Sequence, residues 1–203
     1  MPRVSDAKEK LTEAALGLIW TSGYGATSVD DICAKAGVKK GSFYHFFRSK
    51  ADLEVAALEA HWQRNKQVWN NLFSPSTPPL QRLEDYFAFM VKRQAELKEQ
   101  YGHVLGCPMC SVGTEVSTQE AAIRAKAQEI IERYVKFLES AVRDAHAEGL
   151  IDAPDAHDKA RMLFAYVQGI LTHARISNSL VPLQALKPGA FSLLGVRPVA
   201  AAA

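Results

Sequence analysis

The sequence predicts an all-α protein on three observations. Apolar residues recur at helical spacing along most of the chain, and several helix starts carry a serine with an acid three residues later. The alternating β-branched runs and Asn-Gly or Asp-Gly turns of hairpins are missing from the sequence. With 203 residues, 48% of them hydrophobic, the chain can bury a core without disulfides or metals and is too apolar to be disordered.

Start and stop signals place the first helices. Ser5 is a suitable N-cap for the first helix, and the glycines of 23–25 end it. Ser28 and Asp31 fit a capping box at the start of a second, short helix, which ends at Gly37. A third short helix is expected at about 40–47 and a fourth from the N-cap Ser49 onward.

The second half of the chain has fewer breaks. A fifth helix follows the proline-rich breaker at 74–79, and the glycine-containing stretch 101–114 is expected to be irregular. Ser117 opens a long helix that Gly149 ends. A last long helix is expected from Asp155 to about residue 180, followed by a short one.

Composition also limits where the protein works. No run of about 18 apolar residues could span a membrane, and the N-terminal MPRVSDAKEK is charged where a signal peptide is apolar, so we expect a cytoplasmic protein. Three cysteines in a reducing compartment argue against a disulfide framework. The net charge of +2 says little about partners, and no cofactor is expected.

Residues 21–50 combine two short helices with a tight glycine turn, which is typical of a helix-turn-helix. Between Lys35 and Lys50 there are five cations and no acid. Cations and hydroxyls position DNA phosphates, whereas small and polar side chains can approach base edges. A basic stretch alone is more often a solvated face, but the turn, the caps and the missing acids favour a nucleic-acid interface.

The run GYGATSVDDICAKAGVKKGSFYHFFRSKADL resembles the N-terminal module of the TetR family of bacterial transcription regulators, from about Leu11 to Leu58. The resemblance implies an all-helical homodimer that represses promoters and releases duplex DNA when a small molecule binds. It implies base contacts by Lys40, Gly41, Ser42 and His45, phosphate contacts by Thr27, Tyr44 and Lys50, and either contact by Lys39. Ser28, the cap, is included in this DNA-binding set.

Three regions are therefore expected. Residues 1–50 form the helix-turn-helix DNA-binding domain, and residues 51–197 form a helical domain for effector binding and dimerisation. Residues 198–203 are expected to be a disordered tail. The fourth helix joins the first two regions and is the expected lever between effector and DNA.

The last long helix is apolar around most of its circumference, so it must be covered on two sides. Its own core covers one seam, and a second copy of the chain is expected to cover the other. The alternative is a central helix inside a monomer. The two seams are Met162, Tyr166, Gly169, His173, Ile176 and Leu180, and Leu163, Val167, Ile170 and Ala174.

Cys107 and Cys110 form a C-x-x-C pair four residues after His103. A thioredoxin-like pair would need a βαβ setting, and a soft-metal site on these three residues would lack a further ligand. A thiol switch needs a lowered pKa, which a helix beginning at Pro108 would favour. The Gly-Cys-Pro stretch is similar to a TetR-family subset in which some members sense electrophiles or oxidants. The bland alternative is cysteines that pack as small hydrophobes, as Cys33 is expected to do.

An effector pocket is expected among the helices of the larger domain. Its candidate wall is Trp62, Trp69, Phe87, Met90, Cys107, Tyr134, Phe137, Met162 and Tyr166. Such aromatic and methionine stripes are more often core than pocket, and their low charge favours an apolar or neutral effector.

The function favoured by the sequence is a repressor that releases an inverted-repeat operator when a small molecule binds or a cysteine is modified. The alternative is a thiol-dependent redox or soft-metal-binding protein that uses Cys107 and Cys110. Because no nucleophile stands beside a base and an orienting group in the sequence, we do not expect an enzyme. A purely structural helical dimer is the third possibility.

Overall fold

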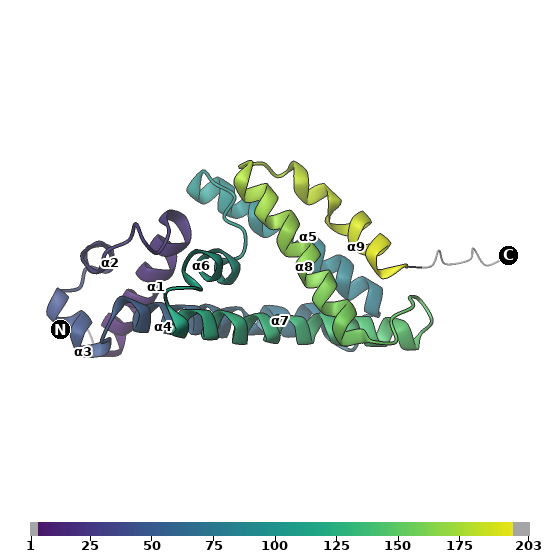
Figure 1. Ribbon diagram of the computed structural model, residues 1–203, viewed down its shortest axis with the longest axis horizontal. Coiled ribbons are helices and arrows are strands. Elements are labelled where there is room, and N and C mark those ends of the chain that lie inside the picture. Colours follow the sequence, from purple (N-terminus) through teal and green to yellow (C-terminus); the bar gives the residue numbers. More distant parts are fainter. Residues whose placement is uncertain (1–3, 197–203) are drawn as a thin grey trace. The chain divides into compact units, whose positions relative to one another are not determined.

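The computed structural model describes residues 4–196, and this part of the chain forms nine α-helices and one 3-10 helix without a strand (Figure 1). The predicted all-α fold is confirmed. None of the described helices is both long and apolar enough to cross a bilayer. The expected tail at 198–203 lies outside the described residues. The helices are α1 Val4–Ser22, α2 Val29–Ala36, α3 Lys40–Phe46, α4 Lys50–Leu72, α5 Pro79–Tyr101, α6 Pro108–Val116, α7 Ala121–Ala147, α8 Ala156–Ile176, η1 Val181–Ala185 and α9 Leu186–Leu194.

Local capping signals account for several helix ends. The Ser28 hydroxyl accepts the Asp31 N–H at 3.1 Å, and the Asp31 carboxylate accepts the Ser28 N–H at 2.9 Å, so the predicted capping box is confirmed. Gly37 ends α2 in the left-handed region at φ 64°. Asp155 caps α8 by accepting the N–H of Asp158 at 2.9 Å.

Two predicted boundaries in the middle of the chain are wrong. Residues 101–114 are not irregular throughout, because α6 begins at Pro108, which suits a first helical turn where no N–H is needed. Gly113 is accommodated within α6, where a Cβ added to it would lie 3.6 Å from the Ala127 methyl. The long helix starts at Ala121 rather than Ser117, whose carbonyl accepts the Arg124 guanidinium at 2.9 Å.

The end of α8 also differs from the prediction, at Ile176 instead of residue 180. Asn178 follows at φ 45°, and its side chain accepts the Val104 N–H at 2.9 Å. The Asn178 carbonyl accepts the Lys98 ammonium at 2.6 Å. These contacts come from distant parts of the sequence, so tertiary structure decides where this helix ends.

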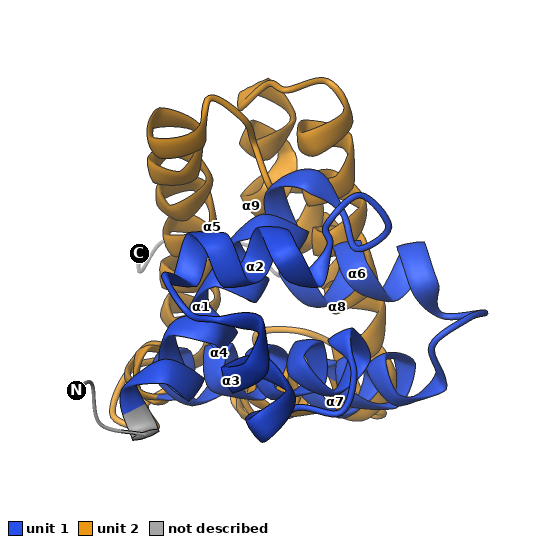
Figure 2. Ribbon diagram, turned by 90° about the vertical axis from the view of Figure 1, so that its left-hand side faces the viewer, with its two compact units in different colours: residues 1–66, 108–131 blue, residues 67–107, 132–203 orange. Residues whose placement is uncertain are grey.

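The chain divides into two compact units (Figure 2). The first contains residues up to 66 together with 108–131, and the second contains 67–107 together with the chain from 132 onward. Thus α6 and the beginning of α7 group with the N-terminal helices. The expected domain boundary after residue 50 stays a prediction.

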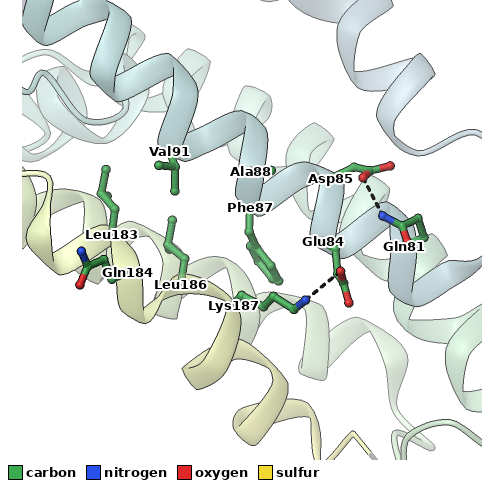
Figure 3. A pocket seen from close by; sticks show the side chains of 10 residues that line it. All are labelled: Gln81, Glu84, Asp85, Phe87, Ala88, Val91, Leu183, Gln184, Leu186 and Lys187. Atoms are coloured by element: carbon green, nitrogen blue, oxygen red, sulfur yellow. Dashed lines mark hydrogen bonds and ion pairs between the residues drawn. The ribbon is translucent and has the colours of Figure 1, made fainter. Parts of the chain in front are cut away.

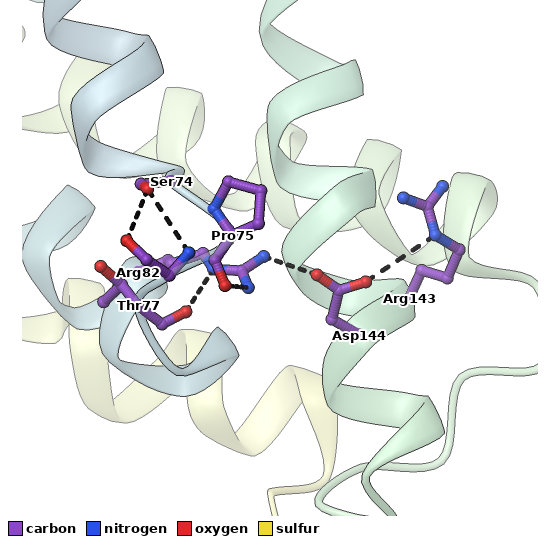
Figure 4. A network of polar contacts seen from close by, with 7 residues as sticks. Ser74, Pro75, Thr77, Arg82, Arg143 and Asp144 are labelled. Carbon is purple, nitrogen blue, oxygen red and sulfur yellow. Dashed lines mark hydrogen bonds and ion pairs between the residues drawn. The ribbon is translucent and has the colours of Figure 1, made fainter.

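The second unit is centred on aromatic residues. The Trp69 ring lies 4.5 Å from the Tyr134 ring and 5.8 Å from the Phe137 ring, measured between centroids. The Phe73 ring stacks on the Trp69 ring, and the centroid of the Tyr86 ring lies 5.4 Å from that of Trp69. Figure 4 shows that the buried guanidinium of Arg82 points into the loop between α4 and α5.

Candidate nucleic-acid interface

The first unit anchors α3 by its aromatic side. Phe43 and Phe47 are buried, with their rings 5.9 Å apart, and Ile32 of α2 is buried as well. Phe46 is half-buried. Burial of these side chains fixes which face of α3 points away from the core.

The opposite face of α3 is open. Tyr44 is 58% exposed, and an added Cβ at Gly41 would meet nothing within 4 Å. Ser42 is half-buried, and Lys39 and His45 are exposed. This face therefore presents small, hydroxyl and basic groups together, which are the groups that approach phosphates and base edges.

Lys40 is held at the edge of this face by an acid of α2. Its ammonium lies 2.9 Å from Asp30, and this hydrogen-bonded ion pair raises the pKa of Lys40. Both side chains are more than half exposed. Exposed ion pairs contribute little to stability, so a phosphate or a base can replace Asp30 at small cost.

Three residues of the predicted DNA set are hydrogen-bonded to other groups of the protein. Thr27 is only 3% exposed, and its hydroxyl donates to the Gly23 carbonyl at 2.7 Å. The Lys50 ammonium donates to the carbonyls of Tyr24 at 2.7 Å and Thr27 at 2.8 Å. The Ser28 hydroxyl is engaged in the capping box. This arrangement favours a role in holding the turn between α1 and α2.

Two acids at the same turn were missed by sequence reasoning. Glu115 of α6 accepts the backbone N–H groups of Tyr24 at 2.9 Å and Gly25 at 2.8 Å. Glu120 accepts the Tyr24 hydroxyl at 3.0 Å. Burial, with help from Glu120, raises the pKa of Tyr24. Some 90 residues separate these partners, so no local signal could have paired them.

A buried carboxyl lies in the same unit. Glu54 of α4 is 1% exposed, and its Oε2 has no hydrogen-bond partner among the residues that the structure describes. Burial and the nearby Glu115 charge raise the pKa of Glu54 to about 7, although Lys50 opposes the shift.

The candidate effector residues lie in different local environments. Trp69, Tyr134 and Phe137 belong to the aromatic centre of the second unit. Met162 is 51% exposed, and the Tyr166 hydroxyl donates to the Ala185 carbonyl at 2.8 Å. Trp62 is buried, and Met90 and Cys107 are half-buried.

Phe87 lines a groove of about 450 Å³ between α5 and the η1–α9 segment (Figure 3). Its apolar floor includes Val91 and Leu186. Glu84 and Lys187, which form an ion pair at 2.8 Å, also line it.

The backbone of the segment before Cys107 is held by hydrogen bonds from two side chains. Gln94 accepts the Gly106 N–H at 2.8 Å and donates to its carbonyl at 3.2 Å. Arg175 donates to the Leu105 carbonyl at 2.7 Å. Cys107 thus stands in a fixed segment, directly before the first residue of α6.

Cys110 lies in the first turn of α6 and lines a cavity of about 240 Å³ beside α7. The proposed soft-metal set of His103, Cys107 and Cys110 is not assembled. Within residues 4–196, no three His, Cys, Asp or Glu side chains group in a way that could hold a metal ion.

Comparison with known proteins assigns the family. The model described as "Bacterial regulatory proteins, tetR family" matches residues 11–57, and "Tetracyclin repressor-like, C-terminal domain" matches residues 79–187, over half of the chain. The chain belongs to the TetR family. It is therefore a DNA-binding transcription regulator, as the resemblance implied, and its helix-turn-helix lies in the N-terminal match.

Similar TetR-family proteins cover most of the chain. The transcriptional regulator AcuR of Cereibacter sphaeroides is 31% identical over 76% of this chain and 71% of its own length. The repressor DhaR of a Mycobacterium species is 29% identical over 87% of this chain and 86% of its own. A crystal structure of a TetR regulatory protein from Rhodobacter sphaeroides superposes with a TM-score of 0.81 and 27% identity, over 92% of this chain and 98% of that one.

Proposed function

We propose that this TetR-family regulator is a cytoplasmic repressor that binds an inverted-repeat operator as a homodimer. The observation that carries the proposal is the open face of α3, where Tyr44, His45 and Lys39 are exposed and Gly41 leaves open space. A helix with this composition fits the major groove, where polar side chains reach base edges and cations reach phosphates.

Within this face, His45, Ser42 and Lys40 would contact bases, and Gly41 would let the helix approach them. Tyr44 and Lys39 would contact phosphates. Thr27 and Lys50 would support the α1–α2 turn, since both are engaged with its carbonyls. Ser28 would cap α2 at the edge of the interface.

The dimer proposal is supported by one side of α8. Ile176 is 80% exposed and Met162 is 51% exposed, whereas Leu163, Val167 and Ala174 on the other seam are buried. Large apolar side chains exposed in line on a soluble helix favour association with a second copy. Two-fold pairing would place two α3 helices one DNA turn apart.

Release of DNA by an effector is part of the proposal. DhaR is named as a repressor, which supports repression as the mode of action here. An apolar or neutral small molecule would bind among the aromatic helices of the second unit, and modification of Cys107 would be a second trigger. We do not favour the thiol-dependent enzyme or soft-metal protein, because the relatives carry regulator names and the metal set is not assembled.

Selection from a random pool of DNA duplexes at moderate salt tests the proposed function. We expect enrichment of an inverted repeat whose half-sites are centred about 34 Å apart. His45→Ala should change the preferred sequence, and Lys39→Ala should weaken binding to all sequences and reduce the salt slope by about one unit. Lys92→Ala, on α5, is the matched exposed control. Failure of the folded wild type to enrich any duplex would overturn the proposal.

Chemical modification tests the thiol trigger. We expect N-ethylmaleimide to release the wild-type protein from the selected duplex, because Cys107 stands at the start of α6, where the helix dipole favours a thiolate. Cys107→Ser should abolish this release, while Cys33→Ser should respond like the wild type because Cys33 is buried in α2. Release that survives Cys107→Ser would contradict the thiol trigger and leave the DNA-binding proposal intact.

A further inference from the structure

The turn between α1 and α2 has its backbone polar groups satisfied from two directions. Both carboxylate oxygens of Glu115 accept N–H groups of the turn, from Tyr24 at 2.9 Å and Gly25 at 2.8 Å. From α4, Lys50 donates to the Tyr24 and Thr27 carbonyls, and its ammonium lies 3.9 Å from the centre of the Tyr24 ring. One short turn is therefore held by hydrogen bonds from both α6 and α4.

This turn leads directly into α2, which begins after the Ser28 cap. Residues 23–28 link α1 to α2, with the Thr27 N–H donating to the Tyr24 carbonyl at 3.3 Å, and α2 starts at Val29. A carboxylate that accepts two N–H groups makes charge-assisted hydrogen bonds, which are about twice as strong as neutral ones. The Tyr24 hydroxyl adds a third link, to Glu120 after α6. The turn held by Glu115 leads into α2, and α2 packs against α3.

The two sides of this contact belong to different parts of the TetR-family architecture. Tyr24 and Gly25 fall in the N-terminal match at 11–57, whereas Glu115 falls in the C-terminal match at 79–187. In space, α6 groups with the N-terminal helices. The helix that carries Glu115 begins directly after Cys107 and lines the cavity at Cys110.

We propose that Glu115 is a positioning residue for DNA binding, which holds the α1–α2 turn so that α3 is presented to the groove. It gives α6 a direct link to the DNA reader, in addition to the lever expected in α4. This inference rests on the proposed function, since it concerns how the same α3 face is presented.

The direction in which DNA affinity changes on removal of Glu115 distinguishes a positioning role from a purely electrostatic one. Glu115 is an anion in the unit that meets the DNA polyanion. If its charge were its only contribution, removing it would strengthen DNA binding. If Glu115 holds the turn, removing it must weaken binding, although a negative charge has been lost.

The test compares Glu115→Ala and Glu115→Gln with the exposed control Glu99→Ala on α5. Affinity for the duplex enriched by the wild type is measured at two salt concentrations. Amide hydrogen exchange is followed at Tyr24 and Gly25. We expect Glu115→Ala to lose about tenfold in affinity with an unchanged salt slope, and to exchange both amides faster. Glu115→Gln keeps one acceptor oxygen and should fall between.

Unchanged or tighter DNA binding by a folded Glu115→Ala would overturn the proposal, and so would unchanged exchange at both amides. If Glu115→Ala fails to fold, the DNA affinity and the amide exchange of Glu115→Gln test the proposal instead. If the wild type enriches no duplex, the proposed function fails, but the exchange measurement still tests whether Glu115 holds the turn.

Discussion

Replacement of Arg82 by alanine is expected to lower the free energy of unfolding by about 3 kcal/mol. The guanidinium is buried and uses all three nitrogens. Nε donates to the Thr77 carbonyl at 2.6 Å, one terminal nitrogen donates to Asp144 at 2.6 Å, and the other donates to the Pro75 carbonyl at 3.2 Å (Figure 4). Removal leaves the Thr77 and Pro75 carbonyls and the Asp144 carboxylate without this partner.

A neighbour provides the matched control for Arg82. Arg143 lies 3.9 Å from the other oxygen of the same Asp144, but its side chain is 61% exposed. Arg143→Ala should change stability by less than about 0.5 kcal/mol. Arg82→Lys should not restore stability, because one ammonium cannot reproduce the planar fork. Chemical denaturation measures all three variants, and equal losses for Arg82→Ala and Arg143→Ala would contradict this account.

Glu54→Gln is expected to stabilise the protein at pH 8 and to have little effect at pH 4.5. The pKa of Glu54 is raised from its usual 4.5 to about 7, so the folded state holds this proton more tightly than the unfolded state. The stability associated with the proton is present below pH 4.5 and is lost as the pH rises through 7. The shift corresponds to at most about 3 kcal/mol at pH 8.

Thermal melting of both proteins between pH 4.5 and 8 measures this effect. The wild type should lose stability across the range, and the glutamine variant should show a flatter profile because its neutral amide avoids the buried charge. Glu99→Gln, at an exposed position on α5, should follow the wild type. Parallel profiles for the wild type and Glu54→Gln would show that Glu54 does not titrate near neutrality.

The parts of the fold that sequence could predict are those with a local cause. The capping box at Ser28 and the left-handed Gly37 involve residues within a few positions of each other, and both are confirmed. The TetR-family assignment followed from the same N-terminal run. The α3 residues expected at the DNA are mostly exposed, although their contacts with bases and phosphates stay predictions.

The parts that sequence could not predict depend on distant partners. The stretch 117–120 does not join α7, and it contains Glu120, which accepts the hydroxyl of Tyr24. The end of α8 depends on Asn178 and its contact with Val104. The two carbonyl partners of Lys50 lie more than twenty positions upstream and have no local signal, and its contact with a phosphate stays a prediction.

The first unit is built from two separate segments of the chain, which has a consequence for how the chain folds during its synthesis. Domains generally begin to fold from the N-terminus as they leave the ribosome. Here the helices up to residue 66 must wait for residues 108–131 before their unit is complete. Until Glu115 emerges, the Tyr24 and Gly25 amides have no carboxylate to bond. The nascent helix-turn-helix is therefore expected to reach its final form only after residue 115 and its neighbours in α6 have been translated.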